Sequence, residues 1–576
     1  MTTEAFDRLC DDVLFDMLSD SPDLAATLGV DEVSGRPLPV TRLPDFSDSA
    51  SERRAAQVND WSRRLDDCAA RFDTAEQAVT RAALEFVFEH GFQFRYPGRA
   101  GHALAVHGDP VTPLTGVHAV ALELLTRGSD FVAAEPARQH LETWAELPRA
   151  LDQARDALSA RRRRGFVTSS LVLDRTLESL HVATETATNE HPFLRTLVRR
   201  TKNLDEVSRG ALLTRAAELL AGEIQPAYAR LAAELETQRA SGRSVISVSE
   251  RPGGGDWYAW RFAGHTTTGM SPAAAHEVGL DELSRLHELL AASLGQLDIG
   301  GNLSDALERW TRDDAFPPGG TGRDAALAVV RDACVAAREG VRHAFNLWPD
   351  ADVEVTPLSE DDESGQHSYY VPPRAGGAEP GVLWLNLATT AAQPRAEATV
   401  LAFHEAWPGH HLQLSIAQQA RLSPLRRALL FNAYLEGWAK YAESLPEALG
   451  VVDDISTRIA RLRTELYSTA TLVLDTGVHV HGWTADRARE FFVEQTGASR
   501  SLADMVVLRS AANPAQLCAY KIGLMKLRKL QRDYAQARGT AYNTRGFHDA
   551  YLGGGALPLD VLERSMRTRA AQENRE

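Results

Sequence analysis

Apolar residues recur every three or four positions along most of the chain, and this spacing constrains the fold more than any other feature. It marks residues 81–92 and 212–236 in the first half, and residues 426–445, 457–475 and 517–538 in the second. A helix places residues at this spacing on one face, so these segments predict amphipathic helices that pack against one another. The fold class that we expect is therefore mainly α.

A short insertion departs from the helical spacing. Between Ala351 and Leu387 the apolar period drops toward two, in DVEVTPL and again in GVLWLNL, with the turn-rich segment SYYVPPRAGGAEPG between them. A period of two is typical of strands, because successive side chains point to opposite faces. These residues predict one small β-sheet, at about 351–387, within the helical chain.

The length of the chain indicates more than one hydrophobic core. It has 576 residues, whereas single cores stop growing at about 250–300 residues. A Gly- and Pro-rich loop, RPGGGDWYAWRFAGHTTTGMSP, ends at Ser271 and Pro272, which are typical of a helix N-cap and first turn. We expect an N-terminal helical lobe at 1–250 and a C-terminal lobe at 251–576.

Charge and cysteine usage narrow the partners and the compartment. The 62 Lys and Arg against 78 Asp and Glu give a net charge of −16, which repels nucleic acid and anionic membranes, so neither is expected as a partner. Cys10, Cys68, Cys334 and Cys518 form no CxxC pair, which is typical of a reducing compartment. The N-terminal segment is acidic and does not resemble a signal peptide, and no run of about 18 apolar residues occurs. We therefore expect a cytoplasmic protein.

The segment HEAWPGHH, residues 404–411, carries the residue types of a metal-dependent hydrolase. A His-Glu pair with a second His four residues after the first presents two imidazoles to a metal beside a carboxylate base. Here Pro408 occupies that fourth position. Because proline interrupts the helix ladder and the glycine after it relaxes the backbone, we expect a bulge that carries His410 to the place of the second ligand. His411 stays open as an alternative, since on a straight helix it shares the face of His404 at about 10 Å along the axis.

A third ligand is available in LEGWAKYAE, where Glu436 stands on what the spacing predicts as the next helix. Three protein ligands and a water form the open arrangement of a catalytic zinc site. Glu405 is then the general base that takes a proton from the water, and Glu443 is a hydrogen-bond partner of a ligand. The plain alternative is that the adjacent histidines cap a helix or face solvent, and that Glu436 is an ordinary surface residue.

With these motifs the chain resembles the bacterial family known as domain of unknown function 885, whose hallmarks are HExxPGHH and EGWAxYAE. Both occur here, as HEAWPGHH and EGWAKYAE. Further segments resemble the family along the whole chain, namely PDLAATLG, GHTTTGMSPAAAHEVGLDEL, SYYVPPRAGGAEPG, LDTGVHVHGW and NPAQLCAYKIG. The resemblance implies one continuous family domain.

The family is in turn similar to the helical gluzincin peptidases, among them thimet oligopeptidase, carboxypeptidase Taq and angiotensin-converting enzyme. This resemblance implies two helical lobes that flank a deep active-site channel, with the small sheet beside a metal helix at about 394–420. It also implies that one zinc ion is ligated by His404, His410 and Glu436, with Glu405 as the catalytic base.

The same resemblance implies how a peptide would be held. The strand GVLWLNL, which ends beside Asn386, would be a sheet edge that aligns an extended substrate through main-chain hydrogen bonds. Tyr369 and Tyr370 would line the cleft. These three residues are therefore expected to bind substrate.

Residues from later segments complete the implied site. Tyr520 and Lys521 come where those peptidases keep a group that steadies the oxyanion, a role for a preorganised donor. Asp475 and His479 of DTGVH would contact the substrate, support the site or stabilise a helix junction. His411, where it is not a ligand, would also contact the substrate.

Three positions depart from the family pattern. Relatives often carry arginines where this chain has Ser468 and Thr471, and often carry tyrosine where it has Ser510. Since arginine binds carboxylates in a planar, bidentate geometry, these losses argue against simply transferring a carboxypeptidase specificity.

The favoured hypothesis is a zinc-dependent hydrolase that cleaves amide or peptide bonds of short or modified peptides. A second hypothesis is a specialised metalloenzyme that acts on one small amide-bearing metabolite. A third is a non-catalytic binding protein on the same scaffold, although a purely structural metal site has no need of Glu405.

Overall fold

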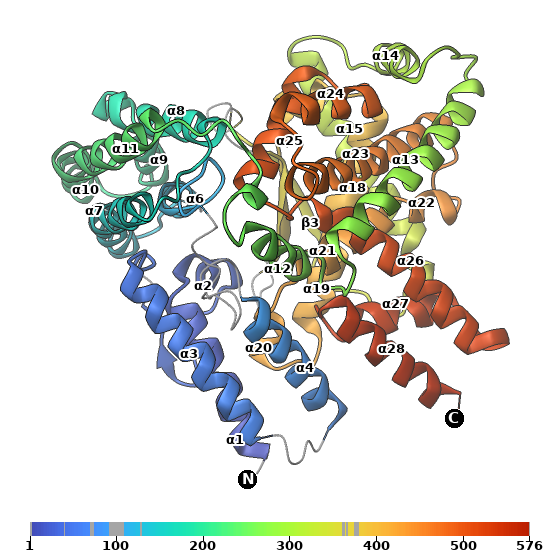
Figure 1. Cartoon of the computed structure of the whole chain (residues 1–576), viewed down its shortest axis with the longest axis horizontal. Helices are drawn as coiled ribbons and strands as arrows, with labels where there is room; N and C mark the ends of the chain where they lie inside the picture. The colour runs from blue at the N-terminus through green and yellow to red at the C-terminus, as the bar shows by residue number, and fades with distance from the viewer. Residues whose placement is uncertain are drawn as a thin grey trace. The chain divides into compact units, whose positions relative to one another are not determined.

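The computed structural model describes residues 3–39, 41–68, 74–91, 109–126, 130–359, 363, 367–373 and 380–574. Within them the chain is mainly helical, with two small sheets (Figure 1). The mainly-α class is confirmed, while the deep channel between two lobes stays a prediction. Part of the turn-rich segment predicted between the strands, residues 374–379, lies outside the described residues.

The described residues divide by their contacts into two compact units. The N-terminal unit lies within 1–73, 87–258 and 511–514, and the C-terminal unit lies within 74–86, 259–510 and 515–576. Every residue expected at the site belongs to the C-terminal unit. The lobes at 1–250 and 251–576 stay a prediction.

The N-terminal unit is built from helices and one short hairpin. The hairpin pairs β1 (Glu32–Val33) with β2 (Arg36–Pro37). The helices are α1 (Thr3–Ser19), α2 (Pro22–Leu28), α3 (Asp48–Asp67), α6 (Val117–Thr126), α7 (Ala134–Arg163), α8 (Ser170–Glu185), α9 (Pro192–Arg200), α10 (Glu206–Leu219) and α11 (Gln225–Ala240).

The long helix α7 shows how the apolar spacing builds this unit. Its positions Leu141, Trp144, Leu151 and Leu158 are buried and lie on one face. That face belongs to one continuous core to which α8, α10 and α11 also contribute. Each large apolar side chain that is fully buried stabilises the fold by ~1.5–3 kcal/mol.

The C-terminal unit contains the remaining helices, of which α4 (Ala75–His90), α12 (Gly254–Thr266) and α25 (Arg500–Ala512) cross the division between the units. The others are α13 (Pro272–Gly295), α14 (Leu303–Asp313), α15 (Gly320–Val341), α17 (Leu387–Ala391), α18 (Arg395–Glu405), α19 (His410–Gln419), α20 (Pro424–Ala428), α21 (Asn432–Ala442), α22 (Leu445–Ala448), α23 (Ile455–His479), α24 (Ala485–Thr496), α26 (Cys518–Arg538), α27 (Thr544–Leu552) and α28 (Leu559–Glu573).

The predicted start of α13 is confirmed. Ser271 has an extended backbone, and its side chain accepts a hydrogen bond from the N–H of Ala274. Pro272 follows at the first helical position, where a missing N–H costs nothing. The helix that begins here packs along α23, which later carries partners of the site.

The predicted small sheet is present, but its order differs from the expectation. β3 (Val353–Pro357) and β4 (Tyr369–Val371) flank β5 (Gly381–Leu385), with β3 parallel and β4 antiparallel to it. The strand GVLWL is therefore central, and the prediction that it forms a free edge is wrong. The physical reason is that β5 pairs with a strand along each of its two edges. Leu383, for example, is paired with Val355 of β3 on one edge and with Tyr370 of β4 on the other.

Two further features concern the compartment. In the described part of the chain, no helix is long and apolar enough to cross a membrane. The four cysteines are all free thiols, and three of them are buried. The cytoplasmic location stays a prediction.

Candidate metal centre

The predicted metal helix is two helices joined by a break. α18 ends at Glu405 and α19 begins at His410, and the residues from 406 to 409 are not helical. Pro408, whose preceding peptide bond is cis, has no N–H with which to continue the helix ladder. The expectation of one bulged helix across 394–420 is therefore wrong in detail, because the interruption is complete.

Gly409 allows the break to turn tightly. A Cβ atom at this position would overlap the backbone carbonyl groups of Phe403 and His404. Glycine is the residue that tolerates so close an approach of backbone to backbone. As a result His410 lies beside His404, with ring centroids 4.9 Å apart and ring planes at 89°.

Helix α21 holds the break in place. The indole N–H of Trp438 donates to the carbonyl oxygen of Pro408 at 2.9 Å, and the amide of Gln413 on α19 donates to the carbonyl oxygen of Tyr434 at 3.2 Å. Trp438 is fully buried. Because the tryptophan that fixes the break stands two residues from Glu436, HEAWPGHH and EGWAKYAE form one structural unit.

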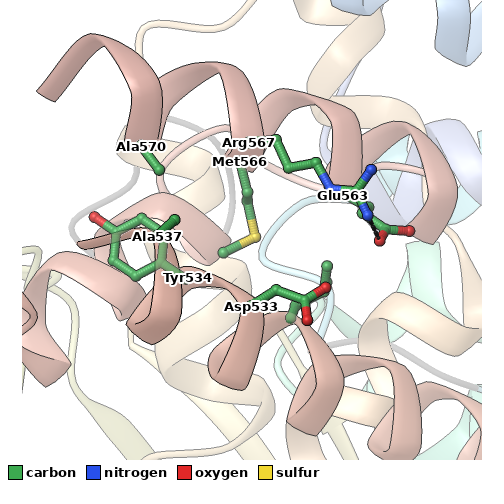
Figure 2. A pocket seen from close by; sticks show the side chains of 8 residues that line it. Asp533, Tyr534, Ala537, Glu563, Met566, Arg567 and Ala570 are labelled. Atoms are coloured by element: carbon green, nitrogen blue, oxygen red, sulfur yellow. Dashed lines mark hydrogen bonds and ion pairs between the residues drawn. The ribbon is translucent and has the colours of Figure 1, made fainter. Parts of the chain in front are cut away.

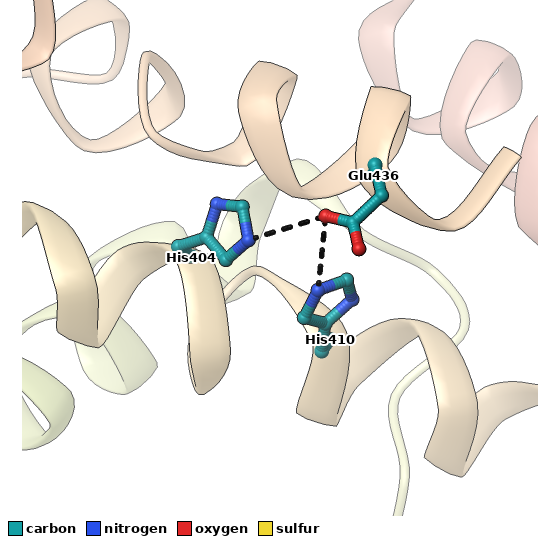
Figure 3. A group of neighbouring side chains, drawn as sticks. All are labelled: His404, His410 and Glu436. Atoms are coloured by element: carbon teal, nitrogen blue, oxygen red, sulfur yellow. Dashed lines mark ion pairs between the residues drawn. The ribbon is translucent and has the colours of Figure 1, made fainter. Parts of the chain in front are cut away.

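His404, His410 and Glu436 point toward one another (Figure 3). Their ligand atoms all lie within 4.8 Å of one another. The Nε2 atoms of His404 and His410 lie 3.5 and 3.7 Å from Oε2 of Glu436. The three side chains keep 15, 14 and 17% of their surface exposed, so water can reach the group.

The geometry of His404, His410 and Glu436 is that of a cation site. It is not that of a cluster whose polar atoms satisfy one another by hydrogen bonds. Oε2 of Glu436 is buried and has no hydrogen-bond partner among the described residues. Ligand atoms about 2.0–2.2 Å from a tetrahedral zinc ion would lie about 3.3 Å from one another, close to the separations around Glu436. The donor set suits zinc and accepts other divalent ions as well.

Glu443 orients His404. Its Oε1 lies 2.9 Å from Nδ1 of His404, so that nitrogen donates and the Nε2 lone pair faces Glu436. Buried Glu443 also accepts from Nζ of Lys440 at 2.8 and 2.9 Å and from the hydroxyl of Thr464 at 2.7 Å. Burial lowers the pKa of His404, but the carboxylates of Glu436 and Glu443 outweigh burial and raise that pKa to about 10. The group therefore attracts positive charge.

Glu405 follows His404 directly and is not one of the three grouped side chains. Burial raises the pKa of its carboxyl, and this exceeds the opposite effect of His404 and His410. A carboxylate whose pKa is raised toward neutrality is a more effective proton acceptor at neutral pH. The role of general base expected of Glu405 stays a prediction.

Tyr520 stands on α26, which crosses α21 at two glycines. A Cβ atom at Gly437 would lie 2.5 Å from the carbonyl carbon of Gly523, so the two backbones touch. Burial raises the pKa of Tyr520, and the charge of Glu436 raises it further, as expected of a phenol near that carboxylate. The Tyr520 hydroxyl accepts from Nη2 of Arg509 at 3.2 Å, which leaves its own proton to be donated.

His411 lies outside the group. Its ring is fully buried, with Nδ1 2.8 Å from the hydroxyl of Tyr370 and Nε2 3.1 Å from the carbonyl oxygen of Ala351. Burial lowers the pKa of His411 to about 4. Of the two alternatives that the sequence left open, the structure brings His410 to Glu436. Tyr370 ties β4 to α19, and the substrate contact expected of half-buried Tyr369 stays a prediction.

Asn386 and Lys521, both expected to bind substrate, have hydrogen-bond or ion-pair partners within the protein. Asn386 is buried, caps α17 and donates to the carbonyl oxygen of Glu363 at 2.8 Å. Lys521 is buried and forms ion pairs with Glu282 and Glu465, each at 2.8 Å. The substrate contacts expected of these two side chains stay predictions. A buried ammonium requires carboxylates around it, and the sequence does not show that α13 and α23 supply them.

Asp475 and His479 stabilise a helix junction, one of the roles expected of them. Asp475 accepts a hydrogen bond from the hydroxyl of Ser510 at 2.9 Å and another from the backbone N–H of Ala515 at 3.0 Å. Nε2 of His479 lies 3.1 Å from the carbonyl oxygen of Ser510. All three residues are fully buried. Of the other departing residues, Ser468 and Thr471 donate to carbonyl groups of their own helix.

Sequence reasoning missed Arg509, which donates to Tyr520, and a basic pair on α12. Arg509 precedes Tyr520 by one helix, and Arg261 and His265 come from α12, where Nη2 of Arg261 lies 2.7 Å from Nε2 of His265. Burial lowers the pKa of His265, and the charges of Arg261 and Arg509 lower it further, which places these groups together. The four-residue spacing of Arg261 and His265 was visible, but not their proximity to α25.

Two surface pockets lie away from the residues of the candidate metal centre. One, of about 20 Å³, lies between α26 and α28 beside Tyr534, Glu563 and Met566 (Figure 2). It has room for about one water molecule. The other, of about 470 Å³, is lined by residues that include Trp348 and Asp549. Neither pocket contains a residue expected at the site.

Comparison with known proteins places the chain among bacterial relatives. The family described as "Bacterial protein of unknown function (DUF885)" matches residues 22–566. No curated protein matches the chain.

Two solved structures share the fold. "The putative lipoprotein from Colwellia psychrerythraea" is 23% identical, with a TM-score of 0.90 over 98% of this chain and 99% of that one. "A putative lipoprotein of unknown function from Shewanella oneidensis" is 16% identical, with a TM-score of 0.73 over 97% of this chain and 99% of that one. At these identities the likeness shows the fold alone.

Proposed function

The chain belongs to the DUF885 family of bacterial proteins, and from the geometry of its site we propose that it is a zinc-dependent hydrolase of amide bonds. Its substrates would be short or modified peptides. The similarity to gluzincin peptidases is part of this proposal, and so are the activity, the metal and the substrate class.

The observation that carries the proposal is the convergence of His404, His410 and Glu436 around a buried oxygen that has no hydrogen-bond partner in the described part of the chain. Structural zinc sites are closed by four protein ligands, whereas catalytic sites keep one position for water. Three protein ligands and partial exposure therefore favour a catalytic site over a structural one. When bound, zinc supplies the Lewis acidity that makes water a nucleophile near neutral pH.

The residues around the ligands would divide the work of hydrolysis. Glu405 would accept a proton from the attacking water and pass it to the leaving nitrogen, which its raised pKa favours. Tyr520 would donate its hydroxyl proton in a hydrogen bond to the developing oxyanion, since Arg509 already donates to the other side of that oxygen. Glu443 would keep the Nε2 atom of His404 directed at the ligand group.

The test is amide hydrolysis by the purified, zinc-loaded protein. A mixture of short peptides and N-acyl amino acid amides is incubated with wild type and with Glu405→Gln, and new amines are followed by mass spectrometry. We expect cleavage by wild type, and a loss of about 10²–10⁴-fold in rate for Glu405→Gln with unchanged zinc content.

The matched control is Glu308→Gln, the same chemical change at an exposed position on α14. It should leave the rate as in wild type. Absence of cleavage of every amide by fully loaded wild type, or full activity of Glu405→Gln, would contradict the proposed chemistry.

A further inference from the structure

We propose that the larger surface pocket, of about 470 Å³, binds a zwitterionic ligand with an apolar side chain, either a free amino acid or a dipeptide. The two sources share one chemistry, namely an ammonium group, a carboxylate and an apolar body. All of the residues that line the pocket belong to the C-terminal unit, and none of them belongs to the candidate metal centre. The inference is therefore independent of the proposed function.

The first observation is the apolar part of the lining. Leu347, Trp348 and Ile416 contribute large apolar side chains to the pocket, whose volume is typical of sites for small molecules. The ring of Trp348 stacks on that of Trp407, with centroids 4.5 Å apart and ring planes at 12°. Trp407 is itself fully buried, so Trp348 is held in place by the core. The apolar surface is thus formed before a ligand binds.

The second observation is that residues of opposite charge line the same pocket. Asp549 stands on α27, and Arg421 follows the end of α19. The Asp549 carboxylate accepts from the side-chain amide of Asn346 at 2.8 Å and from the backbone N–H of Leu347 at 3.4 Å, and both donors are neutral. Within the described ranges, neither Asp549 nor Arg421 has an oppositely charged group within ion-pair distance. Each can therefore form an ion pair with a ligand.

The third observation is that the remaining charge in the lining is already paired. Nε of Arg569 lies 2.8 Å from a carboxylate oxygen of Glu573, and its Nη1 donates to the backbone carbonyl oxygen of Asp549 at 3.2 Å. One positive and one negative charge are left for a ligand. A simple anion would pair with Arg421 but cover the Asp549 carboxylate, and a simple cation would do the reverse. Because covering an unpaired charge is costly, a zwitterion suits the pocket best.

The pocket is well separated from the metal residues. Helix α19 begins at the predicted ligand His410 and ends at Gln419, which lines the pocket. At a rise of about 1.5 Å per residue, these two positions lie about 14 Å apart along the helix axis. Substitutions can therefore distinguish a ligand in the pocket from one at the metal centre.

The test measures dissociation constants by calorimetry for two zwitterions and their single-charge analogues. L-phenylalanine carries both charged groups on one carbon, and its analogues are hydrocinnamate, without the ammonium group, and phenethylamine, without the carboxylate. The second zwitterion, para-aminomethylphenylacetic acid, is an uncleavable mimic of a dipeptide, and its analogues are para-tolylacetate and para-methylbenzylamine. None of these probes contains an amide bond, so the proposed hydrolysis cannot disturb the measurement.

The probes are titrated into purified wild type, Arg421→Gln, Asp549→Asn and Glu436→Ala. Arg532→Gln on α26 and Asp324→Asn on α15 are the matched controls, because they make the same changes at exposed positions. We expect wild type and both controls to bind at least one zwitterion about 5- to 10-fold more tightly than either of its analogues. Glu436→Ala should bind the probes as wild type does.

The two pocket variants should separate the charges. Arg421→Gln should weaken the zwitterion and its carboxylate analogue by the same factor and leave the amine analogue unchanged. Asp549→Asn should weaken the zwitterion and the amine analogue and leave the carboxylate analogue unchanged. A preference for L-phenylalanine would identify a free amino acid as the ligand, and a preference for the mimic would identify a dipeptide.

Wild type that binds neither zwitterion more tightly than its analogues would overturn the proposal, and so would a preference that survives in both pocket variants. Loss of the zwitterion in Glu436→Ala, with full binding in both pocket variants, would place the probe at the metal centre and also overturn the pocket. Because Asp549 holds the backbone of Leu347, Asp549→Asn can disturb the lining itself. The exposed Arg421 then decides, since an amine analogue weakened as much as the zwitterion in Arg421→Gln would contradict the ion pair and the proposal.

Discussion

At the scale of single residues, Glu443 is the clearest example of a side chain that acts through another. It receives Nδ1–H of His404 and is held by Lys440 and Thr464, so that the imidazole presents one nitrogen to Glu436. Such partners of metal ligands fix the tautomer and raise ligand basicity.

Replacing Glu443 by Gln should weaken zinc binding by about 10- to 100-fold, because the amide keeps the size but not the charge that polarises His404. The dissociation constant is measured by competition with a chromophoric chelator. Glu447→Gln is the control, since Glu447 pairs with Arg458 and Arg461 and not with a ligand. Zinc binding as tight in Glu443→Gln as in wild type would refute the orienting role.

The sequence predicted the residues whose spacing is local and missed those whose partners are distant. His404, His410 and Glu436 stand in two short motifs, and Lys440 could have been added from its three-residue spacing to Glu443. The ion-pair partners of Lys521 could not be predicted. Its carboxylate partners come from helices far away in the chain, and only the folded structure brings them together.

At the scale of elements, the contact between α21 and α26 determines where Tyr520 lies relative to Glu436. The helices touch through Gly437 and Gly523, and a Cβ atom at either position would overlap the opposite backbone. The contact explains why glycine follows glutamate in EGW and ends the segment YKIG.

Gly437→Ala should destabilise the protein by about 1–3 kcal/mol, because the added methyl group forces two backbones apart. Unfolding in urea measures the change. The matched control is Gly210→Ala on α10, where a Cβ atom meets nothing within 4 Å, and there the same substitution should stabilise the helix by about 0.5–1 kcal/mol. Equal effects of the two substitutions would contradict the close contact.

The sequence allowed us to predict which segments form helices and strands. It did not allow us to predict the order of the strands or the interruption of the metal helix. Periodicity identified the helices and the strands at 353–357 and 381–385, because it reports which face is buried. Periodicity does not show which strand lies between two others, and for this reason the prediction of β5 as an edge strand is wrong. It likewise did not show that the metal helix is interrupted completely, which depends on how Trp438 and Gly409 fix the backbone.

At the scale of the whole molecule, both units contain buried or half-buried histidines that stay neutral near pH 7. Burial lowers the pKa of each to about 4. The set is His118, His140, His191, His411 and His548.

These histidines should make stability depend on pH in the acidic range. Their pKa in the unfolded chain is about 6.5, so the folded state binds fewer protons than the unfolded state below that pH. The stability they contribute is complete above pH 6.5 and is lost as the pH falls from 6.5 to 4. Urea unfolding at pH 7, 5.5 and 4.5 should show the unfolding free energy falling.

His191→Asn provides the control for this prediction. The His191 ring caps α9 by accepting from the N–H of Phe193, and asparagine can make the same bond without titrating. The variant should show a slope smaller by up to about 1.4 kcal/mol per pH unit. A slope identical to that of wild type would contradict a neutral, buried His191.

If His404, His410 and Glu436 hold one catalytic metal ion, the zinc content of the purified protein must depend on Glu436. Wild type, Glu436→Ala and the exposed control Glu308→Ala are reloaded with zinc, dialysed against a weak chelator and analysed by mass spectrometry. We expect about one zinc per chain in wild type and in the control, and almost none in Glu436→Ala with its helical content unchanged. Wild type without tightly held metal, or Glu436→Ala with a full complement, would contradict this expectation.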